Sequence, residues 1–216
     1  YDLQNSSRTS FYRKYLFGIS GWSSSKTALG KKIKKSVSDN DSVLERFKFQ
    51  LDESNVKTQY TLMPDFSWAC TNVNQIVNKF FGNKFILIFP FSSPNLPHKQ
   101  WPYYNELIKI IKLKHNHLEI VVAPGVNEID KAKNINAITI VNNNKFLNIM
   151  ELAGLIKKSS FVIANDTGPA HMAAHLGMKG IVLFGYHTTA QKVGIETKKF
   201  KSLTVKKLEE LLPDEV

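Results

Sequence analysis

Apolar runs alternate with amphipathic segments along the second half of the chain. Short runs rich in β-branched and aromatic residues predict buried strands at 85–89, 118–123, 137–141, 161–164 and 180–184. Because these runs are apolar on both faces, they favour a parallel sheet that helices cover on each side. The segments between them predict helices at 103–114, 128–133, 146–157 and 169–176. This alternation predicts a doubly wound α/β domain, whose ligands gather at the carboxyl ends of the strands.

Residues 1–82 show a different pattern. Helices are predicted at 6–17, 42–51 and 72–81, and a loop rich in Gly and Ser follows the first of them as far as Gly30. No comparable series of strands is visible in this part of the sequence. We therefore interpret 1–82 as the rear part of an N-terminal α/β domain with its opening strands absent, 82–84 as the linker, and 83–216 as a second domain. A last helix is predicted at 205–212.

An abrupt change from strand to helix follows the run at 161–164. The residues Asp166-Thr167-Gly168-Pro169-Ala170-His171 separate that run from an alanine-rich helical segment. A helix start presents unpaired N–H groups and the positive end of the peptide dipoles, so it attracts phosphate or pyrophosphate. Gly168 allows close approach to the backbone, and Pro169 gives up only an N–H that the first helical position can spare. The Asp166 carboxylate either caps the turn or binds hydroxyl groups of the ligand.

Polar residues also follow the first two predicted strands of this domain. Lys99 is either a solvated surface charge or an ammonium group that reaches the diphosphate and stabilises a departing nucleotide. Ser92 and Ser93 either shape a turn or add hydroxyl donors. Glu128 fits a first-turn carboxylate that the helix dipole favours.

Several stretches match the pattern of one known family. They are Asp-Thr-Gly-Pro-Ala-His-Met-Ala-Ala-His-Leu-Gly at 166–177 with the strand 180–184, Phe-Pro-Phe-Ser-Ser at 89–93 with Lys-Gln-Trp-Pro at 99–102, Ala-Pro-Gly-Val-Asn-Glu at 123–128, and Tyr-Asp-Leu-Gln-Asn-Ser-Ser-Arg-Thr-Ser at 1–10. Together they resemble glycosyltransferase family 9, the ADP-heptose:lipopolysaccharide heptosyltransferases. The resemblance covers most of the chain and is strongest from 84 to 185.

The resemblance implies a two-domain, GT-B-like glycosyltransferase. Such an enzyme moves a heptose-type sugar from an ADP-sugar donor to the lipopolysaccharide core, with inversion and without a metal or other cofactor. Residues 83–216 would form the nucleotide-sugar-binding domain and 1–82 part of the acceptor-side domain, on which the last helix would pack back. The general base is expected upstream of Tyr1, because Asp2 lies too far along the matched segment to inherit that role.

The resemblance also implies roles for individual residues. Asp166 contacts the sugar nucleotide, the N–H groups of Thr167 and Gly168 bind the diphosphate, and His171 donates to a phosphate oxygen. Glu128 accepts hydrogen bonds from ribose hydroxyls. The family's Gly-Pro-Thr-x-Pro turn is replaced here by Gly-Tyr-His-Thr-Thr at 185–189, where Thr188 is expected to keep the phosphate or sugar contact. The complete predicted donor-binding set is Ser92, Ser93, Lys99, Glu128, Asp166, Thr167, Gly168, Pro169, His171 and Thr188.

Composition narrows the choice of partners and compartment. No apolar run approaches the ~20 residues needed to span a bilayer, and the single cysteine, Cys70, excludes an intramolecular disulfide and a thiolate zinc cluster. The net charge of +11 indicates either an anionic partner or a general habit of lysine use. The lysine cluster at 31–35 is either a solvated loop or a contact for a phosphorylated, membrane-embedded acceptor. We expect a cytoplasmic protein that is either free in solution or in peripheral contact with the inner face of the bacterial inner membrane.

Other functions remain as alternatives to glycosyl transfer. A non-catalytic nucleotide-binding module, or an inactive fragment, fits the same motifs. A dinucleotide oxidoreductase is disfavoured because no Gly-x-Gly-x-x-Gly follows a strand, and nucleic-acid binding because the lysines are spread evenly. His171 and His175 have the i, i+4 spacing of a metal site, but no Glu follows His171 and no third ligand is evident.

Overall fold

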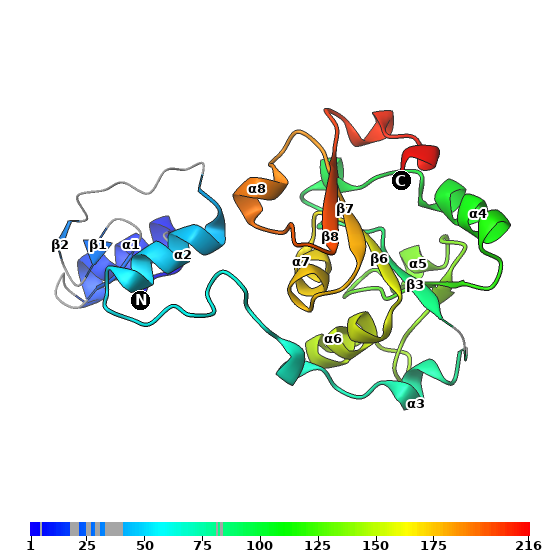
Figure 1. Cartoon of the computed structure of the whole chain (residues 1–216), viewed down its shortest axis with the longest axis horizontal. Helices are drawn as coiled ribbons and strands as arrows, with labels where there is room; N and C mark the ends of the chain where they lie inside the picture. Colours follow the sequence, from blue (N-terminus) through cyan, green and yellow to red (C-terminus); the bar gives the residue numbers. More distant parts are fainter. Residues whose placement is uncertain are drawn as a thin grey trace. The chain divides into compact units, whose positions relative to one another are not determined.

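A parallel sheet forms the centre of the larger part of the chain (Figure 1). The computed structural model describes all residues except 5, 18–21, 25, 26, 29, 30, 33–40, 81 and 83. Within the described residues, the sheet has the order β5-β4-β3-β6-β7-β8, and all neighbouring strands are parallel. The strands are β3 Phe85–Phe89, β4 Glu119–Val122, β5 Ile138–Thr139, β6 Phe161–Asn165, β7 Gly180–Phe184 and β8 Phe200–Thr204. The predicted α/β class is confirmed.

Helices cover both faces because the chain winds outward from β3 to β5 and then returns to the other side of β3. Helices α4 and α5 lie on one side of the sheet, and α6 and α7 lie on the other (Figure 1). Their bounds are α4 Tyr104–Lys114, α5 Ile129–Ala132, α6 Ile149–Lys158, α7 Gly168–His175 and α8 Ala190–Val193. Among the described residues, no helix is both long and apolar enough to cross a lipid bilayer.

The described residues fall into two compact units. The first unit comprises Tyr1–Pro64 with Gln191–Gly194, and the second comprises Asp65–Ala190 with Ile195–Val216. The elements of the first unit are α1 Ser7–Tyr12, a π-helical turn Arg13–Phe17, the short antiparallel strands β1 Thr27–Ala28 and β2 Lys31–Lys32, and α2 Val43–Asp52. The predicted domain boundary at 82/83 and its functional assignment stay predictions. Of the lysine cluster, Lys34 and Lys35 lie outside the described residues.

Residues 65–82 pack with the second unit. The 3-10 turn Ser67–Ala69 contacts α6, and the Thr71 N–H donates to the Met150 carbonyl at 3.1 Å. Gly154 permits this approach, since a Cβ at its position would overlap the Thr71 carbonyl oxygen. The helix predicted at 72–81 is much shorter than expected, because α3 comprises only Asn74–Val77.

The C-terminal segment differs from its prediction. The helix predicted at 205–212 is wrong, because this segment contains only the 3-10 turn Leu208–Glu210. The Val205 N–H donates to the Phe184 carbonyl at 3.0 Å, and Trp101 Nε1 donates to the Leu211 carbonyl at 2.9 Å. The first bond continues the pairing of β7 with β8, and the second ties Leu211 to the loop after β3, so tertiary contacts set the path of this segment. Strand β8 is also missed by the apolar pattern, because it lies at the sheet edge with only its first residue, Phe200, buried.

Replacement of Gly154 by alanine tests the docking of 65–73 on α6. In an open helix this change stabilises, because alanine has the higher helix propensity. Here the added methyl group meets the Thr71 carbonyl, so we expect the free energy of unfolding to fall by about 1–3 kcal/mol. Thermal unfolding followed by circular dichroism measures the change, with Lys158→Ala on an exposed position of α6 as control. A Gly154→Ala variant as stable as the parent protein would contradict the packing described.

Candidate functional site

The candidate site lies at the carboxyl ends of β3 and β6. These strands are neighbours, but the chain leaves them toward opposite faces of the sheet, to α4 after β3 and to α7 after β6. Such a switch point leaves a crevice beyond the strand ends, where open α/β sheets bind their ligands. The loop after β3 carries Ser92, Ser93 and Lys99, and the turn after β6 carries Asp166.

Helix α7 begins at this crevice. Its N-cap residue, Thr167, is extended and makes no side-chain capping bond; its hydroxyl instead donates to the Asn165 carbonyl at 3.3 Å. A Cβ built on Gly168 would meet no atom within 4 Å, so open space borders the first turn. The positive end of the α7 peptide dipoles is therefore accessible to an anion.

Polar side chains from separate loops meet at the Asp166 carboxylate. Oδ2 of Asp166 lies 2.7 Å from Lys99 Nζ and 2.9 Å from His187 Nε2. Oδ1 lies 3.5 Å from Nε2 of His171, on the first turns of α7. The Asp166 side chain is only 4% exposed, whereas the Lys99 side chain is 20% exposed. A buried carboxylate is thus held by a cation that still reaches solvent.

These contacts set the protonation states at the site. Burial alone would raise the pKa of Asp166, but the contacts with His171, Lys99 and His187 hold it well below its ordinary value. Burial lowers the pKa of His187 although Asp166 favours its charged form. His187 Nδ1 is buried without a hydrogen-bond partner among the described residues, which also disfavours a proton there. At neutral pH a neutral His187 therefore donates its Nε2–H to an ionised Asp166.

Asn165 is absent from the predicted site but fixes its geometry. This fully buried side chain donates from Nδ2 to the Pro90 carbonyl at 2.8 Å. Its Oδ1 lies 3.2 Å from the Trp101 N–H and 3.3 Å from the Tyr104 hydroxyl. Burial raises the pKa of Tyr104, so this hydroxyl remains a donor. Both ends of the loop that carries Lys99 are thereby tied to the residue next to Asp166.

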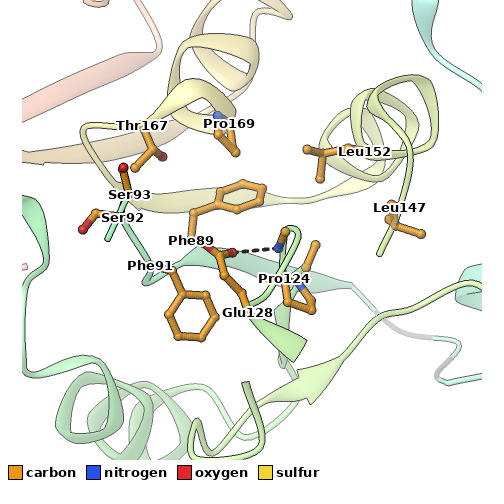
Figure 2. Close-up of a pocket in the computed structure, with 12 residues that line it drawn as sticks. Phe89, Phe91, Ser92, Ser93, Pro124, Glu128, Leu147, Leu152, Thr167 and Pro169 are labelled. Carbon is orange, nitrogen blue, oxygen red and sulfur yellow. Dashed lines mark hydrogen bonds between the residues drawn. The ribbon is translucent and has the colours of Figure 1, made fainter. Parts of the chain in front are cut away.

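A cavity of about 220 Å³ adjoins the first turn of α7. Figure 2 shows side chains from the β3 end, the loop after β4, α6 and α7 around it. Its apolar lining includes Phe89, Phe91, Pro124, Leu147 and Leu152, and the predicted residues Ser92, Ser93, Glu128, Thr167 and Pro169 also line it. Apolar walls with a few polar groups suit a flat ring that carries polar substituents.

Two of the polar residues at this cavity also have local roles. The Glu128 Oε2 accepts a hydrogen bond from the Gly125 N–H at 2.7 Å, which shapes the turn before α5 (Figure 2). The Ser92 hydroxyl donates to the Leu96 carbonyl at 3.0 Å, as a turn residue does. Both side chains nevertheless border the cavity, so the turn and ligand-binding interpretations are compatible.

The loop after β7 supplies a residue that the predicted donor-binding set does not include. The phosphate or sugar contact expected of Thr188 stays a prediction, and the side chain of this loop that reaches Asp166 is that of its neighbour His187. The sequence signal that points to His187 is the departure from the Gly-Pro-Thr-x-Pro pattern, because this departure introduces an imidazole beside the site. Among the described residues, no three His, Cys, Asp or Glu side chains are placed to hold a metal ion.

Comparisons with known proteins relate this site to one family. Residues 3–208 match the family model described as glycosyltransferase family 9 (heptosyltransferase). A lipopolysaccharide core heptosyltransferase, OpsX of Haemophilus influenzae, is 31% identical over 113 residues, which are 50% of this chain and 32% of that protein. The solved structure of the E. coli heptosyltransferase WaaC with ADP has a TM-score of 0.64 at 16% identity, covering 86% of this chain and 58% of WaaC. The structure of E. coli ADP-heptose lps heptosyltransferase II has a TM-score of 0.58 at 16% identity, and the match covers 80% of this chain and 58% of that protein. The chain therefore spans less than two thirds of the length of these relatives.

Removal of the Lys99 ammonium tests the electrostatics of the cluster. Because the folded pKa of Asp166 is depressed, its contribution to stability is present above the unfolded pKa and is lost as the pH falls through the folded pKa. In Lys99→Met the folded pKa of Asp166 rises, so we expect acid unfolding to begin at higher pH. Circular dichroism against pH measures this, with the exposed Lys109→Met on α4 as control. Identical acid transitions for both variants and the parent would contradict the ion pair.

Proposed function

Because this chain belongs to glycosyltransferase family 9, the heptosyltransferase family, we propose that its second unit binds the ADP-linked sugar of a heptosyl transfer. The acceptor is the growing lipopolysaccharide core. The observation that carries this proposal is the Lys99–Asp166 pair, placed beside the first turn of α7 and next to a cavity with apolar walls. The relative named a lipopolysaccharide core heptosyltransferase supports the same reaction class.

The nucleoside part of the donor fits the cavity. Adenine is flat and largely apolar on its faces, which matches walls that include Phe89, Pro124 and Leu152. Glu128 borders the same cavity and has one carboxylate oxygen engaged by Gly125, so the other is available for ribose hydroxyls. We therefore propose that the nucleoside binds beside β4 and α6.

The diphosphate occupies the space between α7 and the loop after β3. The open side of Gly168 admits it to the positive end of the helix, and the hydroxyls of Ser93 and Thr167 border the same space. Lys99 exchanges part of its contact with Asp166 for phosphate oxygens. These groups concentrate positive charge without a metal ion, which is why we propose a metal-independent reaction.

The transfer step makes one bond and breaks another at the anomeric carbon. The acceptor oxygen bonds to that carbon from the face opposite the diphosphate, the bond to the phosphate oxygen breaks, and ADP leaves with the electron pair. Lys99 and the α7 N-terminus stabilise the charge that grows on the leaving group, which is the largest electrostatic task in the step. The proton of the acceptor hydroxyl passes to a carboxylate base, a role for which we assign no residue of this chain.

Two further features of the proposal concern the surroundings of the reaction. Transfer to a lipid-linked acceptor takes place at the cytoplasmic face of the inner membrane. Peripheral contact with that membrane would use the lysine cluster at 31–35, whose positive charge complements anionic lipids.

Titration with ADP tests the donor site. We expect binding by calorimetry to be equal with and without EDTA. Because charge-assisted hydrogen bonds are the strong ones, Lys99→Met should weaken ADP binding about ten- to hundredfold. Lys109→Met, which removes an equal charge on an exposed position of α4, should bind as the parent does. Absence of ADP binding by folded protein, or a strict requirement for a divalent cation, would overturn the assignment.

A transfer assay separates an enzyme from a binding module. ADP-heptose and a lipopolysaccharide core acceptor should yield ADP at a rate that depends on both substrates. ADP binding without any such release would select the non-catalytic alternative, in which the same site serves only to hold a nucleotide.

A further inference from the structure

A column of aromatic rings leads from the core to the surface at the carboxyl end of β7. The fully buried Phe184 stacks on His187, with ring centroids 6.0 Å apart. His187 meets His98 edge to face at 5.5 Å, and the His98 ring lies 5.7 Å from that of Tyr186. Tyr186 ends the column and is 72% exposed. A large aromatic side chain therefore stands in solvent beside the Asp166 cluster.

The Asp166 carboxylate and the packing of two loops hold this column in place. His187 Nε2 lies 2.9 Å from Asp166 Oδ2, so the middle ring is bound to the buried carboxylate. The two loops also pack closely, because a Cβ on Gly185 would lie 3.6 Å from His187 Nδ1 and 3.9 Å from the His98 carbonyl oxygen. One face of the Tyr186 ring thus packs against the column, while most of the ring is in solvent. Packing of the core does not require an aromatic residue at this position.

The order of the strands indicates which part of a donor would reach this ring. The cavity for the nucleoside is lined by the loop after β4, and the groups for the diphosphate follow β3 and β6. The next strand along the sheet is β7, whose carboxyl end carries Tyr186. A nucleotide-sugar laid along this edge from β4 places its sugar at the end of β7.

We propose that Tyr186 and His98 form a platform for the pyranose ring of the sugar that the donor carries. This inference rests on the proposed function and adds a specificity-determining pair to it. A pyranose has an apolar C–H face that packs on aromatic rings and a rim of hydroxyls that needs polar partners. Asp166 Oδ1, which lies 3.5 Å from His171 Nε2, belongs to the same cluster and can accept from that rim.

The test compares ADP-heptose with ADP in each variant, so that the charge difference between the two ligands is the same throughout and the effect of a substitution on sugar binding stands out. Calorimetry with ADP-heptose, in the absence of acceptor, and with ADP reports the contribution of the sugar. We expect Tyr186→Ala to weaken ADP-heptose binding about three- to tenfold and to leave ADP binding within about twofold of the parent. Tyr186→Phe, which keeps the ring, should bind both ligands as the parent does.

Two controls make the result specific. Trp68→Ala removes another exposed aromatic side chain of the second unit, which is 79% exposed, and should change neither affinity. Thermal unfolding of Tyr186→Ala should match that of the parent, since the ring is mostly in solvent. His98→Ala should follow Tyr186→Ala in the ratio of the two affinities.

The possible outcomes distinguish this inference from the proposed function. An equal loss for both ligands in Tyr186→Ala would mean that the ring contacts the nucleotide, and an unchanged affinity for both would make it a surface residue; either result overturns the platform while ADP binding stands. Failure of the parent protein to bind ADP at all would overturn the proposed function instead, and the platform with it.

Discussion

The geometry of the candidate site depends on the hydrogen bonds of Asn165. One buried amide holds the Pro90 carbonyl and the Trp101 N–H, which lie at the two ends of the loop after β3. Without these bonds, buried polar backbone groups at the switch point would lose their partners, which is costly away from water. Because Asn165 immediately precedes Asp166, the same residue pair fixes the loop and presents the carboxylate that Lys99 contacts. The packing at the end of the sheet and the electrostatics of the site therefore both depend on the neighbouring residues Asn165 and Asp166.

The Asp166 cluster illustrates how desolvation and charge are balanced. A carboxylate at 4% exposure would be strongly disfavoured alone, but Lys99 and two imidazoles compensate for the lost water. The cluster draws on the loops after β3, β6 and β7 and on α7, so it exists only when the sheet is assembled. Its formation reports on folding of the whole switch point rather than on any single loop.

Much of the second unit could be predicted from sequence because its signals are local. The runs at 85–89 and 180–184 become strands with those bounds, since strands buried on both faces have continuous apolar sequences. The strand-to-helix turn at Asp166 has its own signature of glycine and proline. Several predicted donor-binding residues accordingly gather around one crevice. Their roles toward a ligand stay predictions.

What sequence could not predict depends on contacts between distant segments. An edge strand such as β8 buries only its first residue and mixes polar with apolar side chains, so its pattern resembles a surface segment. The stretch 205–212 is predicted as a helix, but tertiary contacts hold it on another path, since the Val205 N–H donates to Phe184 and the Leu211 carbonyl accepts from Trp101. Asn165 and His187 act through partners that are 64 and 21 residues away in the chain, in Trp101 and Asp166 respectively. Residue spacing within a local motif cannot predict contacts between segments so far apart in the sequence.

The Lys99–Asp166 ion pair would compete with any anion that binds at this site. The Asp166 carboxylate is held beside the Lys99 ammonium, so an incoming anion must displace it. A cellular anion with a single weak charge gains little binding energy by replacing a carboxylate that is already in place. Under the proposed function, the diphosphate of the donor would engage the α7 N-terminus and the Lys99 ammonium together, so it has more to gain from that exchange. The pair would then favour a diphosphate over small anions of single charge before the base or the sugar is recognised.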